Sequence, residues 1–150
     1  MKRAIPGVNI QWPWSQLLLS GVKTVETRGY PLPAKYIGQE LALIETPGPR
    51  GKKEAGIERA RIIGTIVFSG SIEYRSGGAW SKDRDRHQVQ QDDPVFAFRA
   101  GTPKWGWVVE QVTKLIEPSA APARRGIVFA ARCAIPSGYG PSIDDAGFLD

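Results

Sequence analysis

A short segment near the start of the chain carries three charged side chains at close spacing: Lys23, Glu26 and Arg28. Lysine and arginine suit contact with phosphate, because lysine gives a point charge and arginine a bidentate fork. Glu26 cannot bind phosphate, but it can hold the two cations in place, act as a general base or accept a hydrogen bond from a base edge. A salt-bridged trio that only fixes the local backbone is the alternative that the residues leave open.

A second basic cluster lies between residues 50 and 61, in a chain whose formal net charge is +5. Arg50, Lys52 and Lys53 belong to it, in a loop whose glycines can bring backbone amides near an anion. Such a local positive field attracts polyanions, of which nucleic acid is the commonest. The alternative is a solvated basic loop. No phosphate-binding loop of the G-x-x-x-x-G-K-[ST] type is present in the sequence, so nucleotide hydrolysis has no support.

Aromatic residues flank the charged trio in the sequence. Trp12 and Trp14 flank Pro13, and Tyr30 follows the charged trio. A ring at the wall of a groove would stack on a base, which contributes roughly 1–3 kcal/mol in such sites. We expect Trp14 to be a core residue, whereas Trp12 and Tyr30 are candidates for stacking.

Residues that could support other chemistries are scarce. The single Cys133 can form no internal disulfide, and a free, buried thiol suits a reducing cytoplasm. The single His87 excludes a two-histidine nuclease mechanism, and its charged neighbours predict a surface position. The adjacent Asp92 and Asp93 would alternate between the two faces of a strand. We therefore predict no metal and no cofactor.

The length of 150 residues fits one domain, residues 1–150. The charged start leads into no sustained apolar run, so we expect no signal peptide, no membrane span and a cytoplasmic location. Periodicity and turn residues predict strands at 4–10, 23–28, 41–44, 61–74, 95–98 and 105–116, helices at 14–20 and 52–60, an exposed loop or helix at 81–93, a last apolar segment at 124–131 and a loose tail at 136–150.

Two blocks of the sequence resemble the signature of the ASCH domain family, in the PUA-like superfamily. The first is Ile10-Gln11-Trp12-Pro13-Trp14, and the second runs from Gly21 to Arg28 and matches G-x-K-x-x-E-x-R. Trp12 intervenes between Gln11 and Pro13, where many members read Gln-Pro-Trp directly. The resemblance covers about residues 5–132, and only these two blocks are specific.

The resemblance implies an α+β fold, a small PUA-like mixed β-barrel with short flanking helices and a groove facing residues 21–28. Members of the superfamily include passive binding modules, a metal-free nuclease active on single-stranded RNA, and small amidohydrolases that remove an acetyl group from modified cytidine.

We expect a domain that binds single-stranded RNA in a basic groove, with DNA left open as the ligand. The expected binding residues are Trp12, Lys23, Arg28, Tyr30, Arg50, Lys52 and Lys53. Metal-independent ribonuclease activity is a plausible addition, with Lys23, Glu26 and Lys53 as the candidate catalytic residues: Glu26 or a lysine as the base and the cations as stabilisers of the phosphorane.

Two alternatives remain. An amidohydrolase acting on a modified nucleoside would need a threonine three residues after the lysine, a position that Glu26 occupies here. A protein-interaction module would recruit a partner through an apolar rim, and nothing in the sequence names that partner.

Overall fold

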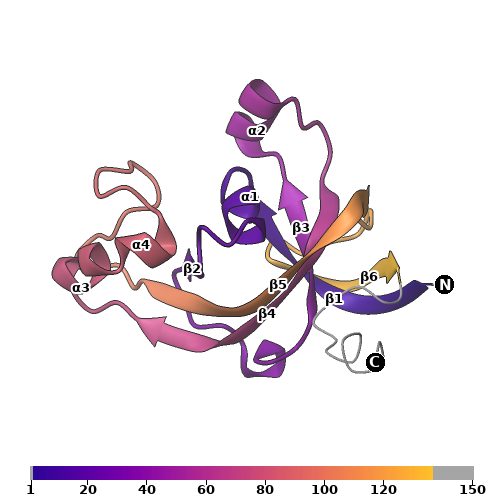
Figure 1. Cartoon of the computed structure of the whole chain (residues 1–150). Coiled ribbons are helices and arrows are strands. Elements are labelled where there is room, and N and C mark those ends of the chain that lie inside the picture. Colours follow the sequence, from indigo (N-terminus) through magenta and orange to yellow (C-terminus); the bar gives the residue numbers. More distant parts are fainter. Residues whose placement is uncertain (1, 137–150) are drawn as a thin grey trace, which may run out of the picture.

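The structure, a computed structural model, describes residues 2–136 (Figure 1). Six strands form one mixed sheet in the order β2-β5-β4-β3-β1-β6. The pairing of β1 with β3 is parallel, and all other neighbours in the sheet are antiparallel. The strands are β1 (Lys2–Gln11), β2 (Val25–Arg28), β3 (Leu41–Thr46), β4 (Arg61–Glu73), β5 (Trp105–Ala120) and β6 (Phe129–Pro136).

Short helices occupy the connections between strands. The crossover from β1 to its parallel neighbour β3 contains the first helix and β2. Figure 1 shows α2 standing beyond the end of β3, and α3 and α4 grouped at the far end of β4 and β5. The helices are α1 (Trp14–Leu19), the 3₁₀ helix η1 (Ala34–Tyr36), α2 (Gly48–Ala55), α3 (Gly77–Lys82) and α4 (Arg84–His87).

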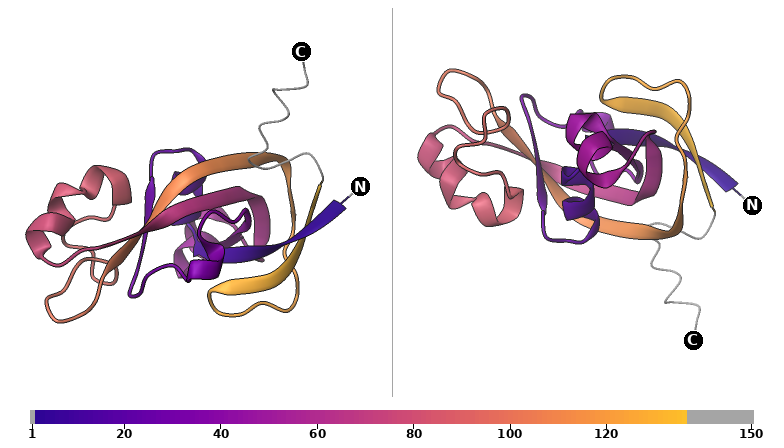
Figure 2. Two further views of the ribbon diagram at one scale, coloured as in Figure 1. Left: turned by 90° about the horizontal axis from the view of Figure 1, so that it is seen from below. Right: turned by 90° about the horizontal axis from the view of Figure 1, so that it is seen from above.

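The sheet is strongly curved but not closed (Figure 2). Its edges are β2 and β6, and no pairing joins them within residues 2–136. The expected barrel is therefore wrong as to closure, while the α+β class is confirmed. The reason lies in strand length: β2 has four residues and pairs only with residues 105–108 of β5, so the curl that the bulges of β4 and β5 introduce is not completed.

The main core lies against the concave sheet and is covered on one side by α1. Its fully buried members include Ile10, Leu18, Phe68 and Trp107. A buried carboxylate fixes α1 to the sheet: Glu45 of β3 accepts hydrogen bonds from Ser15 Oγ and Gln16 Nε2, both at 2.7 Å, and from Arg61 Nε at 2.9 Å. This anchor holds the first turn of α1 against the sheet.

Most expected elements are present with shifted bounds, and three expectations are wrong. Residues 95–98 form a turn instead of a strand, because Asp93 Oδ1 accepts hydrogen bonds from the backbone N–H groups of Val95 and Phe96. The second helix spans residues 48–55 and not 52–60, since Gly56 in a left-handed conformation ends it. His87 is fully buried instead of exposed.

The expectations for Cys133, for the tail and for membrane spans have separate outcomes. Cys133 is free and buried, as expected. The expected tail at 136–150 lies outside the described residues beyond Pro136. Within residues 2–136, no helix has both the length and the hydropathy that a membrane span requires.

Candidate functional site

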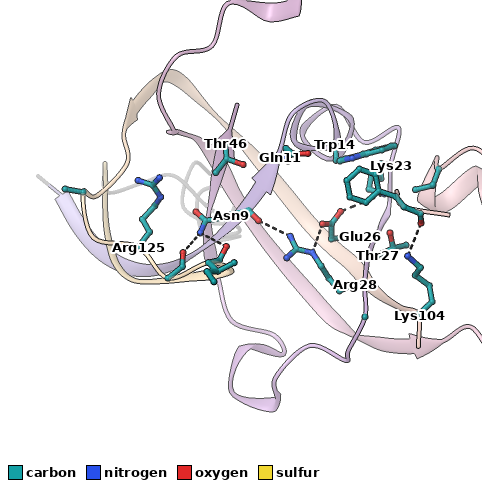
Figure 3. Close-up of a pocket in the computed structure, with 16 residues that line it drawn as sticks. Asn9, Gln11, Trp14, Lys23, Glu26, Thr27, Arg28, Thr46, Lys104 and Arg125 are labelled. Carbon is teal, nitrogen blue, oxygen red and sulfur yellow. Dashed lines mark hydrogen bonds and ion pairs between the residues drawn. The ribbon is translucent and has the colours of Figure 1, made fainter. Parts of the chain in front are cut away.

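A cleft of about 560 Å³ opens between the charged segment on one side and the loop of residues 121–128 on the other (Figure 3). The end of β1, α1 and β2 form one wall, and the loop before β6 forms the other. The lining residues are Asn9, Gln11, Trp14, Lys23, Glu26, Thr27, Arg28, Gly29, Thr46, Val89, Phe96, Lys104, Ala123, Arg125, Gly126 and Ile127.

The charged trio lies in this wall, and the alternation of β2 places two of its members there while Lys23 precedes the strand. Val25 points into the core and is fully buried, so Glu26 and Arg28 lie next to the cleft. Arg28 Nε donates to Glu26 Oε2 at 2.9 Å. Lys23 Nζ lies 3.9 Å from the other carboxylate oxygen, Glu26 Oε1. The three side chains form one buried ionic network at the base of the cleft.

Lys23 is 1% exposed, an unusual environment for an ammonium group. It donates a hydrogen bond to the His87 carbonyl oxygen, and its Nζ lies 4.9 Å from the centre of the Trp14 ring. Burial lowers the pKa of Lys23 to about 8; Glu26 opposes this shift, and the nearby charges of Arg28 and Lys104 add to it. A substantial neutral fraction of Lys23 therefore exists at mildly alkaline pH.

The partner of Lys23, His87, is held in one tautomer. Its Nδ1 accepts from the backbone N–H of Val89 at 3.0 Å, so its Nε2–H donates to the Trp80 carbonyl oxygen at 2.8 Å. The imidazole also stacks on the Trp80 ring, with 3.7 Å between centroids. Burial lowers the pKa of His87. These contacts make His87 a neutral structural residue that fixes the carbonyl group to which Lys23 binds.

Arg28 connects β2 to β1 across the base of the cleft. Its Nη2 donates to the Asn9 carbonyl oxygen at 2.9 Å, and its guanidinium lies 5.1 Å from the centre of the Trp107 ring. Together with the bond to Glu26, these contacts hold the guanidinium in a single plane. Its charge is fixed in position beside the cleft.

Asn9 joins the two walls. Its Nδ2 donates to the carbonyl oxygens of Gly126 at 2.8 Å and Ile127 at 3.2 Å, while its Oδ1 is buried and has no hydrogen-bond partner among the described residues. The loop held in this way carries Ile127, which is 95% exposed. An apolar side chain so open to solvent at the rim of a cleft is a ready contact for a ligand.

Two further cations lie towards opposite ends of the cleft, with the charged trio between them (Figure 3). Lys104 Nζ donates to the Phe96 carbonyl oxygen at 2.9 Å, and burial lowers the pKa of Lys104. Arg125 Nη1 donates to the Pro122 carbonyl oxygen at 2.9 Å. Each retains N–H donors that this single bond does not use.

The structure places three of the predicted site residues in the cleft and five outside it. Those in the cleft are Lys23, Glu26 and Arg28. Tyr30 packs against Trp107, with 5.9 Å between ring centroids. Arg50 lies over the Trp12 ring beside the cleft, 5.5 Å from its centre. Lys52 and Lys53 are exposed on α2 and do not line the cleft.

Sequence reasoning missed three residues of the site: Asn9, Lys104 and Arg125. The Arg124-Arg125 doublet at the start of the last apolar segment is a signal that could have indicated Arg125. Nothing in the local sequence marks Asn9 or Lys104. The place of β1 in the sheet brings Asn9 to the cleft, and the place of β5 brings Lys104, the residue before it. Within residues 2–136, no group of three or more histidine, cysteine, aspartate and glutamate side chains is placed to hold a metal ion.

Comparison with solved structures identifies the architecture. The chain superposes on the crystal structure of ASCH from Zymomonas mobilis with a TM-score of 0.55 and 16% identity, over 77% of this chain and 72% of that one. It has the fold of an ASCH domain. A serine-to-alanine variant of the Zymomonas mobilis ASCH protein gives a TM-score of 0.58 at 17% identity, over 84% of this chain and 86% of that one. A tyrosine-to-phenylalanine variant gives 0.55 at 18% identity, over 79% and 76%.

The ASCH fold agrees with the resemblance of residues 10–14 and 21–28 to that family's signature. No protein-family model and no curated protein matches the sequence. At 16–18% identity the structural likeness establishes the fold alone. The chemistry of the cleft has to be argued from its own residues.

Proposed function

We propose that this ASCH-fold domain binds single-stranded RNA by taking one nucleotide into the cleft. The observation that carries the proposal is the composition of the lining: four cationic side chains and one carboxylate surround an apolar face that includes Trp14, Val89 and Phe96. Apolar and aromatic faces suit a base, and cations suit phosphate. The volume of about 560 Å³ lies within the roughly 300–1,000 Å³ of small-ligand sites, so the unit that fits is a nucleotide and not a duplex.

The placement of the cations favours a strand over a free nucleotide. Lys104 and Arg125 lie towards opposite ends of the cleft, as the two phosphates that flank a nucleotide within a strand require (Figure 3). Both keep N–H donors that their single hydrogen bond does not use, whereas Lys23 is only 1% exposed and Arg28 is bonded to both Glu26 and Asn9. In this proposal Lys104 and Arg125 contact phosphate, and the buried trio sets the positive potential between them.

Glu26 provides a hydrogen-bond acceptor in the cleft. Its Oε2 is held by Arg28, while its Oε1 is 3.9 Å from Lys23 Nζ, which is too far for a hydrogen bond. Oε1 can therefore accept a hydrogen bond from a base N–H or from a ribose 2′-hydroxyl. The second of these would distinguish RNA from DNA.

Binding is tested by titrating the protein into fluorescein-labelled single-stranded RNA of mixed sequence at several salt concentrations. We expect the affinity to fall as salt rises, because phosphate contacts release counterions. Lys104→Ala and Arg125→Ala should each weaken binding and reduce the salt slope by about 1. Lys114→Ala is the matched control, since Lys114 is exposed on β5 outside the cleft. An absent or salt-independent signal contradicts the proposal, and equal binding of single-stranded DNA removes the role of the 2′-hydroxyl.

Metal-independent cleavage of the bound RNA is the second candidate, and the environment of Lys23 favours it. Its pKa of about 8 leaves roughly a tenth of the side chain neutral at pH 7, 3.9 Å from Glu26. Either group could take the proton of the 2′-hydroxyl, whose oxygen then bonds to phosphorus. The 5′-oxygen leaves and takes a proton from water, which gives a 2′,3′-cyclic phosphate and a 5′-hydroxyl end.

Cleavage is tested by incubating purified protein with single-stranded RNA in EDTA and analysing the ends of the products. We expect cyclic phosphates from the wild type and from Lys114→Ala, and none from Glu26→Gln or Lys23→Ala. Lys53→Ala is included because the sequence predicts Lys53 to be catalytic, whereas the structure places it on α2 away from the cleft. The variant tests between these two positions. Cleavage that survives in both cleft variants is not a reaction of this cleft.

A further inference from the structure

A smaller hollow of about 220 Å³ adjoins the cleft and shares part of its wall. Three residues line both spaces: Gln11, Trp14 and Phe96. The rings of Trp14 and Phe96 meet edge to face, 5.7 Å between centroids, and form the partition between the two. The remaining residues of this side hollow are Trp12, Pro13, Arg50, Asp93, Pro94 and Val95.

We infer that the side hollow binds the base of the nucleotide adjacent to the one in the cleft, so that the minimal ligand is a dinucleotide. This inference rests on the proposed function. Nothing in the fold requires an apolar space at this position, yet Trp12 is only half-buried and Val95 is 67% exposed. Aromatic and apolar surface left open beside a cationic cleft is what a second, sequence-tolerant base contact needs.

The charges around the side hollow suit a polyanion. Arg50 lies over the Trp12 ring on the α2 side, and α2 presents Lys52 and Lys53 to solvent just beyond it. The one carboxylate in the lining, Asp93, has its Oδ1 turned to the backbone N–H groups of its own turn. Arg50 itself donates to the Glu54 carboxylate at 2.9 and 3.3 Å, an exposed ion pair that a phosphate would have to share or replace, whereas Lys52 and Lys53 carry the exposed charges beside it.

A cation also lies where the cleft and the side hollow meet. Lys104 Nζ donates to the carbonyl oxygen of Phe96, the residue that separates them. A phosphodiester that joins a nucleotide in the cleft to one in the side hollow has to pass this partition, within reach of Lys104. The basic face of α2 would then receive the strand as it leaves.

The test compares ligands that differ by one nucleoside. We would measure by calorimetry the affinity of a nucleoside 3′,5′-bisphosphate and of the corresponding dinucleotide with a 5′-phosphate, both with free 2′-hydroxyl groups, and check by chromatography that the dinucleotide is intact at the end of the titration. The bisphosphate carries both phosphates of the first nucleotide but no second base. We expect the dinucleotide to bind about tenfold more tightly, the gain typical of one added stacking contact.

Two charge-matched variants locate that gain. Val95→Glu introduces a carboxylate at the exposed rim of the side hollow, and Ile116→Glu introduces one on β5, where the side chain is 81% exposed. We expect Val95→Glu to abolish the advantage of the dinucleotide and to leave the bisphosphate affinity within about twofold, because the cleft itself is unchanged. Ile116→Glu should leave both affinities unchanged. Trp12→Phe, which keeps a ring, should keep part of the advantage.

The outcomes separate this inference from the proposed function. If both ligands bind equally well, the inference is wrong and the nucleotide cleft stands. If neither binds, the proposed function fails and the inference fails with it. If Val95→Glu and Ile116→Glu reduce the dinucleotide advantage alike, the second base does not lie in the side hollow, and the inference is overturned.

Discussion

The side-chain amide of Asn9 donates a hydrogen bond to the carbonyl oxygen of Gly126, 117 positions later in the chain, at 2.8 Å. A second bond from the same nitrogen reaches the Ile127 carbonyl oxygen. A single residue of β1 thus positions the loop that forms one wall of the cleft. Loops that lack such a tether are the least protected parts of a fold.

We expect Asn9→Ala to release this loop. Two hydrogen bonds are lost and two carbonyl groups lose partners, so the free energy of unfolding should fall by about 1–2 kcal/mol. Hydrogen exchange followed by mass spectrometry should show faster exchange in residues 121–128, and RNA affinity should decrease. Exchange in α3 and α4, far from the loop, serves as the internal reference. Unchanged exchange in the loop would show that its other contacts hold it.

Because burial lowers the pKa of Lys23, we expect a rise in pH to increase the free energy of unfolding and to decrease the affinity for RNA. The pKa of Lys23 is lowered from 10.5 to about 8 in the folded chain, so between those values the unfolded chain binds more protons and stability rises with pH. The gain is on the order of 3 kcal/mol across that window. Affinity for RNA should instead fall above pH 8, as the cleft loses a charge.

Chemical denaturation and RNA titration between pH 7 and 10 check this prediction, with Lys23→Met as the comparison. The variant should lose the rise in stability over that window and should show a flatter pH dependence of binding. Glu26, Arg28, Lys104 and His87 also surround the Lys23 ammonium. A variant that retains the full wild-type rise would assign it to another group.

Glu26 lies between two buried cations, and its neutralisation should be costly. In Glu26→Gln the charges of Lys23 and Arg28 lose their shared partner, and removing one member of a buried ionic network costs roughly 3 kcal/mol. The pKa of Lys23 should fall further, because Glu26 is the group that raises it. Thermal denaturation and NMR titration of the Lys23 side chain measure the two effects. Glu54→Gln, in an exposed pair with Arg50 on α2, is the control and should leave the melting temperature nearly unchanged, because solvent screens that pair.

Because His87 is buried, we expect the protein to lose stability on mild acidification. Burial lowers the pKa of His87 below 6.5, so the unfolded chain takes up a proton first, and stability should fall as the pH drops below about 6.5. A proton on Nδ1 would also break the bond from the Val89 N–H. Urea unfolding at pH 7.5 and pH 5.5 measures the effect. In His87→Gln the difference between the two pH values should shrink, and if it does not, carboxylates account for the loss.

Five of the six strands were predicted with shifted bounds, β6 was predicted only as an apolar segment, and the closure of the sheet was predicted wrongly. Runs such as residues 61–74 carry β-branched residues whose pattern indicates a strand whatever its partners are. Whether a sheet closes depends on where bulges bend it and on how long the edge strands are. Those properties belong to the pairing of β4 with β5 and to the four residues of β2, and neither is visible in a local pattern.

The candidate site could be predicted only where it is local in sequence. Lys23, Glu26 and Arg28 form a compact motif, and the alternation of a strand brings the last two to one side. Lys104 lies 76 residues beyond Arg28, and only the pairing of β2 with β5 brings it close. The prediction of a strand at residues 95–98 was wrong for a related reason. The side chains suit a strand, but Asp93 accepts hydrogen bonds from the backbone N–H groups of Val95 and Phe96, which a strand would need.

The order of the sheet has a consequence for when the cleft exists. The wall that Asn9 holds belongs to the segment leading into β6, and β6 is the last strand of the sheet along the chain although it pairs with β1, the first. During synthesis, a nascent chain would expose the cationic segment of residues 23–28 long before the opposite wall has left the ribosome. Under the proposed function, selective capture of a nucleotide would then begin only once β6 has paired with β1.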